Sequence, residues 1–170
     1  MESRRQIGRK AWSNHKVKAL VSAICLSILF IVDRVTKLYA LEHFSFEHVI
    51  NPFLSFELVF NRGVSWGLFH GSSTLGFMLL TAVILVGTLV FSREAYKKAR
   101  QGENVIGELL IITGSVSNIL DRVLYNGVID FIVVHYGAWS WPVFNIADAG
   151  IVLGVGSMII QLIKQHNATI

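Results

Sequence analysis

Four long apolar segments divide the sequence, and each is close to the ~20 residues that a helix needs to cross a bilayer. They run from about residue 17 to 37, 74 to 91, 105 to 124 and 143 to 163. Basic residues precede the first segment, as in a cleaved signal peptide, but DRVTK follows it instead of a small-residue cleavage site. We therefore predict four retained transmembrane helices in a single integral membrane domain, residues 1–170.

The first of the longer connections, residues 38–73, contains a pattern typical of a short sheet. Residues 53–60 alternate in part and favour a strand, with one side formed by Phe56, Leu58 and Phe60. A turn at residues 62–63 and a second strand at about 64–69 are predicted to follow. The predicted fold is thus mainly α, with four transmembrane helices, a small extracytoplasmic β-sheet and a short outer-loop helix.

Lys and Arg are distributed unevenly among the connections, and short loops rich in them stay in the cytoplasm. Residues 1–18 carry six and the loop between the second and third spans carries four, whereas residues 38–73 carry one and residues 125–142 none. Both termini are therefore predicted to be cytoplasmic.

Only 15% of the residues are charged, against roughly 25% in soluble proteins. The basic residues then report topology, and no nucleic-acid partner is expected.

Several polar residues lie where the predicted helices should be apolar. A charged group inside a membrane costs roughly 2.5–3.5 kcal/mol, so each one indicates a partner or a function. With this topology, one layer at the outer face receives polar residues from the predicted helices and from the outer loops. The helices contribute Asp33, Lys37, Asn118, Asp121, Arg122, Asn145 and Asp148, and the outer loops contribute Asn61 and Asp130. Elements distant in sequence thus converge on one layer.

These charged residues fall into two groups. Asp33 and Lys37 are four apart on one helix face and can pair, and Asp121 with Arg122 could equally be a structural ion pair. Asp130 and Asp148 have no basic neighbour within four positions. Two adjacent carboxylates cannot easily both ionise, so one holds a proton while the other acts as a base. Such a pair can activate water for attack on an amide bond.

Other chemistries have less support. There is no HExxH, the six histidines are scattered and Cys25 is the one cysteine, so no metal or cofactor is expected. A membrane subunit relaying protons would spread ionisable groups across the bilayer, yet only Glu108 lies near the opposite end of a span. A scaffold held by buried ion pairs would tolerate replacement of Asp130. Close helix packing is predicted at three glycines of the fourth span: Gly150, Gly154 and Gly156.

The chain resembles lipoprotein signal peptidase, also called signal peptidase II, over nearly its whole length. The matching blocks are DRVTK at 33–37, NRGVSWG at 61–67, GSVSNILDR at 114–122, GVIDF at 127–131 and FNIAD at 144–148. The last three together, at this spacing, are highly specific. The chain departs from the family at Ser117, where Gly is common, and at Thr113-Gly114, where a Gly pair is common.

The resemblance implies an aspartic endopeptidase of the bacterial cytoplasmic (inner) membrane, with its active site at the extracytoplasmic face. By resemblance Asp130 and Asp148 match the catalytic aspartates. The family implies substrate binding or support of the pair for Asn61, Gly63, Asn118, Arg122 and Asn145. It implies structural polar support for Asp33, Lys37 and Asp121. The implied substrate is a diacylglyceryl-modified prolipoprotein, cut before its lipidated cysteine. The expected partners are this substrate and membrane lipids, and the expected state is a monomer.

Overall fold

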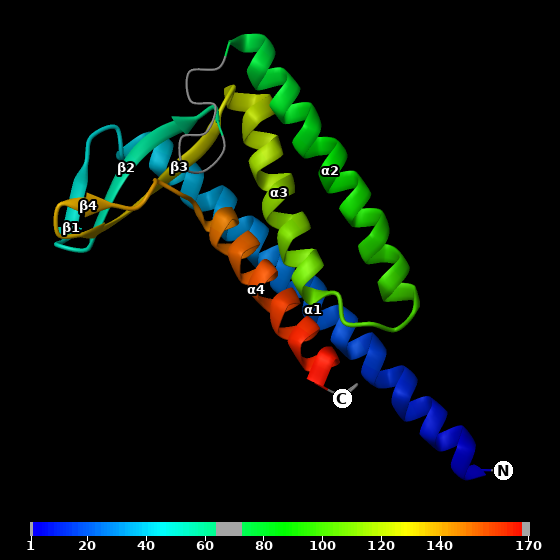
Figure 1. The fold of residues 1–170 in the computed structure, drawn as a ribbon. Coiled ribbons are helices and arrows are strands. Elements are labelled where there is room, and N and C mark those ends of the chain that lie inside the picture. Colours follow the sequence, from blue (N-terminus) through cyan, green and yellow to red (C-terminus); the bar gives the residue numbers. More distant parts are fainter. Residues whose placement is uncertain (1, 64–72, 168–170) are drawn as a thin grey trace.

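The computed structural model describes residues 2–63 and 73–167, with the backbone alone for residues 2–19. Its body consists of four helices: α1 (Glu2–His43), α2 (Thr74–Arg100), α3 (Ile106–Tyr125) and α4 (Ile146–Asn167). Figure 1 shows α3 in the centre, with α2 along one side of it and α1 and α4 along the other. The predicted four helices are therefore confirmed.

Two of the helices, α2 and α4, are long and apolar enough to cross a membrane. The helices also continue past the predicted apolar segments, because polar residues with good helix propensity follow them. Thus α2 continues nine residues beyond position 91, where a salt bridge joins Lys97 to Glu94 at 2.6 Å. Ser73 caps the N-terminus of α2, because its side chain accepts a hydrogen bond from the backbone N–H of Gly76.

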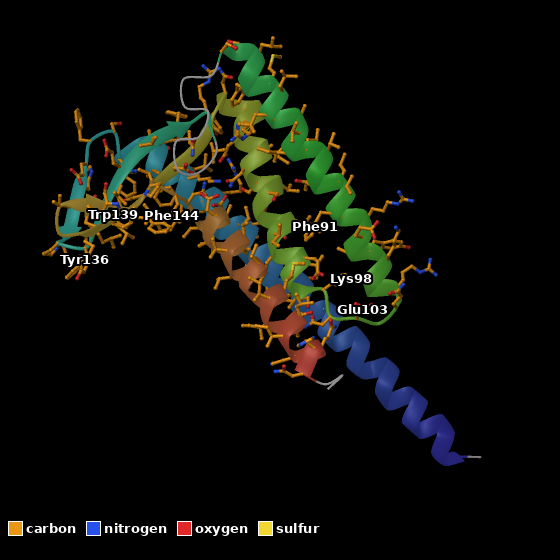
Figure 2. The ribbon with its side chains drawn as sticks, in the orientation of Figure 1. Phe91, Lys98, Glu103, Tyr136, Trp139 and Phe144 are labelled. Carbon is orange, nitrogen blue, oxygen red and sulfur yellow. The ribbon has the colours of Figure 1, made fainter. Side chains whose placement is uncertain are left out.

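A four-stranded antiparallel sheet lies beyond one end of the helices (Figure 1). Its strands follow the order β1 (His48–Asn51), β2 (Leu54–Asn61), β3 (Val128–Tyr136) and β4 (Trp139–Ser140). Phe44, just after α1, stacks on Phe56 at 5.0 Å and so attaches the sheet to the helix. Tyr136 and Trp139 are exposed at the far tip of the sheet (Figure 2).

The sheet confirms one predicted strand and corrects several details. The strand predicted at residues 53–60 is β2, but the one predicted at 64–69 lies outside the described residues. A bulge between Phe56 and Val59 interrupts the alternation of β2, so Phe56, Leu58 and Phe60 do not share one side. In the described parts of the outer connections, residues 44–63 and 126–145, there is no short helix.

Small residues let α3 and α4 approach closely. A Cβ on Gly154 would lie 2.6 Å from the carbonyl oxygen of Gly107, and one on Gly114 would lie 2.5 Å from that of Ala147. A Cβ on Gly150 would meet Leu29 of α1 at 2.9 Å. The packing role predicted for Gly150 and Gly154 is thus confirmed, whereas Gly156 has nothing within 4 Å and the prediction was wrong there.

Candidate active site

Lys37 is the centre of a buried ionic cluster beside the site. Its ammonium group lies 2.8 Å from an oxygen of Asp33 and 2.8 Å from an oxygen of Asp121, and it donates to Oδ1 of Asn118 at 2.8 Å. The lysine and both aspartates have 0% exposure. Arg34 forms a second ion pair with Asp121. The predicted pairing of Asp33 with Lys37 is confirmed, and the cluster joins α1 to α3.

Asp33 also connects this cluster to α4. Its Oδ1 accepts a hydrogen bond from the backbone N–H of Ala147 at 2.7 Å, and its Oδ2 accepts one from the Ser117 hydroxyl at 2.6 Å. Ser117 is the position where the family often has Gly. Here its hydroxyl strengthens the contact between α3 and α1.

Arg122 does not pair with Asp121, contrary to one of the predicted alternatives. Consecutive residues on a helix point in directions about 100° apart, so Asp121 faces α1 while Arg122 faces the end of β2. Arg122 donates to the backbone carbonyls of Arg62 and Gly63 and lies over the Phe77 ring, 5.4 Å from its centroid. It therefore fixes the connection that follows Asn61.

Asp130 lies within β3, not in a loop as predicted. The antiparallel ladder pairs it with Val59 of β2, and its side chain is directed towards the helices. Its two oxygens accept hydrogen bonds from Nδ2 of Asn145 at 2.6 Å and from Nδ2 of Asn61 at 3.0 Å. Asn61 is held in turn by the N–H of Gly63, which donates to its Oδ1 at 3.0 Å.

The pKa of Asp130 is raised to about 7. Burial is the largest cause, because this carboxyl is only 2% exposed and desolvation disfavours its charged form. The negative charge of Asp148 is the second cause, and the hydrogen bonds from Asn61 and Asn145 oppose both. The two carboxyl groups are thus close enough for the charge of one to affect the other.

Asp148 lies in the first turn of α4, and local capping positions it. The side-chain oxygen of Asn145 accepts from the backbone N–H of Asp148 at 2.9 Å, and the backbone N–H of Asn145 donates to Oδ2 of Asp148 at 3.3 Å. This reciprocal pair is a capping box, with Asn145 before the helix and an acidic residue three positions later. The other oxygen of Asp148 accepts from Nδ2 of Asn118 at 2.8 Å.

Asn145 connects the two aspartates. It is 0% exposed, and its amide group donates to Asp130 while its backbone and side chain hold Asp148. It also donates to Oδ1 of Asn118 at 3.2 Å, the same atom that accepts from Lys37. A continuous hydrogen-bonded network therefore runs from the ionic cluster through Asn118 and Asn145 to both carboxyl groups.

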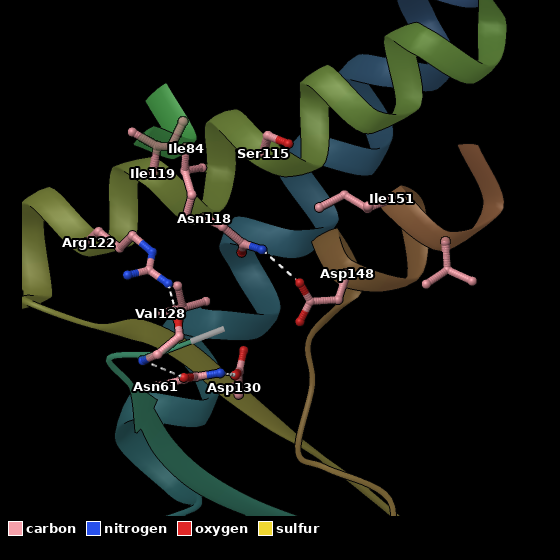
Figure 3. A pocket seen from close by; sticks show the side chains of 12 residues that line it. Asn61, Ile84, Ser115, Asn118, Ile119, Arg122, Val128, Asp130, Asp148 and Ile151 are labelled. Carbon is pink, nitrogen blue, oxygen red and sulfur yellow. Dashed lines mark hydrogen bonds between the residues drawn. The ribbon is translucent and has the colours of Figure 1, made fainter. Parts of the chain in front are cut away.

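Both carboxyl groups open into one cavity of about 270 Å³ between the sheet, α3 and α4 (Figure 3). The cavity is lined by Asn61, Gly63, Ile84, Ser115, Asn118, Ile119, Arg122, Val128, Asp130, Asp148, Ile151 and Val152. Its polar residues gather at the aspartates, and aliphatic side chains from α2, α3 and α4 form other parts of the wall. Among the described residues neither Asp130 nor Asp148 forms an ion pair, which leaves both free to exchange protons.

The predicted site residues thus lie in two connected groups, the ionic cluster and the cavity lining, and Asn145 joins the two through its hydrogen bonds. Arg34 and Ser117, which bond to Asp121 and Asp33, were not identified as members of this network. Both lie inside the sequence blocks that carry the family resemblance, and this position was the signal that could have identified them. The aliphatic wall residues had no sequence signal, since nothing separates them from other apolar residues of the spans.

The chain is similar in sequence to known proteins. Residues 25–164 match the family described as "Signal peptidase (SPase) II". The lipoprotein signal peptidase of Methylobacterium sp. (strain 4-46) is 42% identical over 117 residues, covering 68% of this chain and 69% of the relative. That of Clostridium novyi (strain NT) is 36% identical and covers 82% and 97%. That of Burkholderia mallei (strain SAVP1) is 32% identical and covers 92% and 96%.

A solved structure described as a bacterial membrane enzyme superposes with a TM-score of 0.64 at 31% identity, covering 86% of this chain and 89% of the other. A second one of the same description gives 0.62 at 31% identity, covering 85% and 93%. The fold is therefore that of a bacterial membrane enzyme. The chain belongs to the signal peptidase II family, and it is accordingly a peptidase.

Proposed function

We propose that this protein is an aspartic endopeptidase that removes the signal peptide from diacylglyceryl-modified prolipoproteins. The bond cut is the amide just before the lipidated cysteine. The observation that carries the proposal is the arrangement of Asp130 and Asp148. They line one cavity, have no ion-pair partner among the described residues and are joined through Asn145.

In the proposed mechanism the two aspartates share one proton. The ionised carboxylate removes a proton from a water molecule, and the protonated carboxyl donates a hydrogen bond to the carbonyl oxygen of the scissile amide. The raised pKa of Asp130, about 7, supports this because one carboxyl then retains a proton near neutral pH. The pair titrates as a unit, so the shared proton belongs to both residues.

The surrounding residues keep the pair in position. Asn145, Asn118 and Asn61 each donate to one of the carboxylates, which orients the oxygens without neutralising them as a Lys or Arg would. Asp33, Lys37 and Asp121 hold α1, α3 and α4 together beneath the site. Gly63 and Arg122 hold the outer connection beside the cavity. The chain needs no metal or cofactor for this reaction and acts as a monomer.

The proposed setting is the bacterial cytoplasmic membrane. All four helices cross the bilayer, both termini face the cytoplasm, and the polar layer lies at the extracytoplasmic edge. Six charged residues within these spans are compatible with this because they are paired or buried in the protein interior: Asp33, Arg34 and Lys37 of α1, and Glu108, Asp121 and Arg122 of α3. The acyl chains of the substrate then stay among membrane lipids while the amide bond reaches the aspartates.

A processing assay with the purified full-length protein tests the substrate. The lipidated precursor should be converted to the shorter form, whereas the same precursor without the diacylglyceryl group should remain uncut. The proposal would be contradicted if both precursors were cleaved equally well, or if neither were cleaved.

The orientation has a separate test. In a background carrying Cys25→Ala, a membrane-impermeant maleimide applied to intact spheroplasts should label Glu57→Cys and leave Glu103→Cys unlabelled. Both positions are exposed in the structure. The reverse labelling pattern would exclude the proposed topology.

A further inference from the structure

Three cavities follow one another between α2, α3 and α4. The first, of about 270 Å³, contains the aspartates. The second, of about 290 Å³, shares Ile84 and Ser115 with the first. The third, of about 520 Å³, shares Phe91 and Ile111 with the second. Because the shared residues form walls of adjoining cavities, the three make one groove, which we call the helix groove. It runs from the aspartates to the opposite end of the helices.

The lining of the helix groove changes along its length. The middle cavity is mostly apolar, with Gly87, Ile112 and Phe91 among its residues. The third cavity adds charged and amide side chains at the ends of the helices: Lys98, Glu103, Asn104, Glu108, Gln161 and Gln165. Figure 2 shows Phe91, Lys98 and Glu103 following one another towards the α2–α3 connection, away from the sheet. The groove is therefore apolar in the middle and polar at both ends.

Glu108 is the unusual residue at the far end. It is only 3% exposed, and one of its oxygens lies 2.8 Å from the ammonium group of Lys98. The other oxygen, Oε2, is buried and has no hydrogen-bond partner among the described residues. A buried carboxylate oxygen without a partner is destabilising, so this atom indicates a site for a cationic donor. Glu103 lines the same cavity, so two carboxylates face one ammonium group there.

A signal peptide has the matching pattern of properties. It consists of a positively charged N-terminal region, an apolar region of about 7–15 residues and a cleavage site. Along α3, Glu108 and Asn118 are ten residues apart, which is about 15 Å at the helical rise per residue. An apolar region of that kind, if helical, spans about 10–22 Å. With the cleavage site at the aspartates, the charged region falls at Glu108.

We propose that the helix groove holds the signal segment of the substrate and that Glu108, assisted by Glu103, binds its positively charged N-terminal region. This inference rests on the proposed function and adds a second recognition site at the end predicted to face the cytoplasm. The enzyme then reads two features of its substrate, the lipidated cysteine at one end of the groove and the positive charge at the other.

Steady-state kinetics with two lipidated precursors test the inference. One precursor keeps the Lys and Arg residues of its N-terminal region, and the other has Gln in their place. Glu108→Gln should raise KM for the basic precursor about fivefold, as expected for one partly solvated charge pair. It should leave kcat unchanged and leave both constants unchanged for the neutral precursor.

Two variants accompany this measurement. Glu94→Gln is the matched control, because Glu94 is exposed, pairs with Lys97 on the surface and does not line the groove. It should behave as the parent on both precursors. Glu103→Gln lies in the exposed α2–α3 connection and should show the same selectivity for the basic precursor with a smaller change. It keeps the test decisive if Glu108→Gln does not fold.

Three results would overturn the inference. One is an unchanged KM in both variants, and another is an equal change for the basic and neutral precursors. The third is a change that disappears in vesicles without phosphatidylethanolamine, which would identify the far end as a lipid headgroup site. In each case the parent still cleaves the lipidated precursor. Failure of the parent to cleave either precursor would instead contradict the proposed function.

Discussion

Asparagine in place of Asp130 should change how the stability of the protein depends on pH. The folded carboxyl has a pKa of about 7, against 3.8 for the free group, so the folded state binds this proton more strongly than the unfolded chain does. Below pH 3.8 the carboxyl group is protonated in both the folded and the unfolded protein, so it does not change the free energy of unfolding. As the pH rises from 3.8 to 7, the unfolded chain releases the proton first, and the free energy of unfolding falls.

The size of the effect follows from the width of this window. One pH unit within it corresponds to about 1.4 kcal/mol, so the full window amounts to about 4 kcal/mol. Between pH 5 and pH 8 the parent should lose about 3 kcal/mol through this group. Asp130→Asn has no such proton, so it should not show this loss. Its amide provides one acceptor where the carboxylate provides two, which costs about 1–3 kcal/mol at every pH.

Thermal unfolding in a non-ionic detergent, followed by tryptophan fluorescence, measures the difference. From pH 5 to pH 8 the Tm of Asp130→Asn should rise by about 6–12 °C relative to that of the parent. Glu57→Gln removes an exposed carboxylate from the same sheet and serves as the control, with a pH dependence like that of the parent. Parallel curves for the parent and Asp130→Asn would refute the argument that burial beside Asp148 keeps this carboxyl protonated.

Three further changes test other parts of the structure. Asn145→Ser should keep the cap of α4, since Ser caps nearly as well as Asn, but should lose the amide that donates to Asp130 and Asn118; the expected result is a lower Tm together with at least a tenfold lower kcat of the protein that remains folded, and an unchanged kcat would contradict the bridging role. Lys37→Met should leave the buried Asp33 carboxylate without an ion pair and Asp121 paired with Arg34 alone, and should lower stability by about 3–5 kcal/mol, seen as loss of monodisperse protein in size-exclusion chromatography; a normal elution profile would exclude the structural role. Gly154→Ala should lower the Tm because its Cβ meets backbone at 2.6 Å, whereas Gly156→Ala should not; similar Tm values for the two would contradict the packing described between α3 and α4.

The helices could be predicted from sequence because runs of about 20 apolar residues are long and distinct signals. β3 could not. Its residues 128–133 are buried on both sides apart from Ile132, so they lack the polar alternation that identifies a strand, and a run of this length is compatible with several structures. The sequence therefore predicts a loop at Asp130, although this residue lies within the central ladder of the sheet.

The candidate site also has features that could be predicted from the sequence and features that could not. The convergence of polar residues followed from the predicted topology, and the spacing of Asp33 and Lys37 indicated their pairing. Arg34 could not be assigned in this way, because its partner Asp121 lies on another helix and only the packing of α1 against α3 joins them. The role of Asn145 could be predicted only in part. Its position three residues before Asp148 is a readable capping pattern, but its contact with Asp130 depends on how β3 meets the start of α4.

The central claim is that Asp130 and Asp148 together activate the water that cleaves the signal peptide. The most direct measurement is a gel-shift assay on a lipidated precursor, comparing the parent with Asp130→Asn and Asp148→Asn, each first verified as folded by its elution profile. The proposed mechanism predicts complete conversion by the parent and no detectable product from either variant. Near-normal cleavage by either folded variant would contradict it.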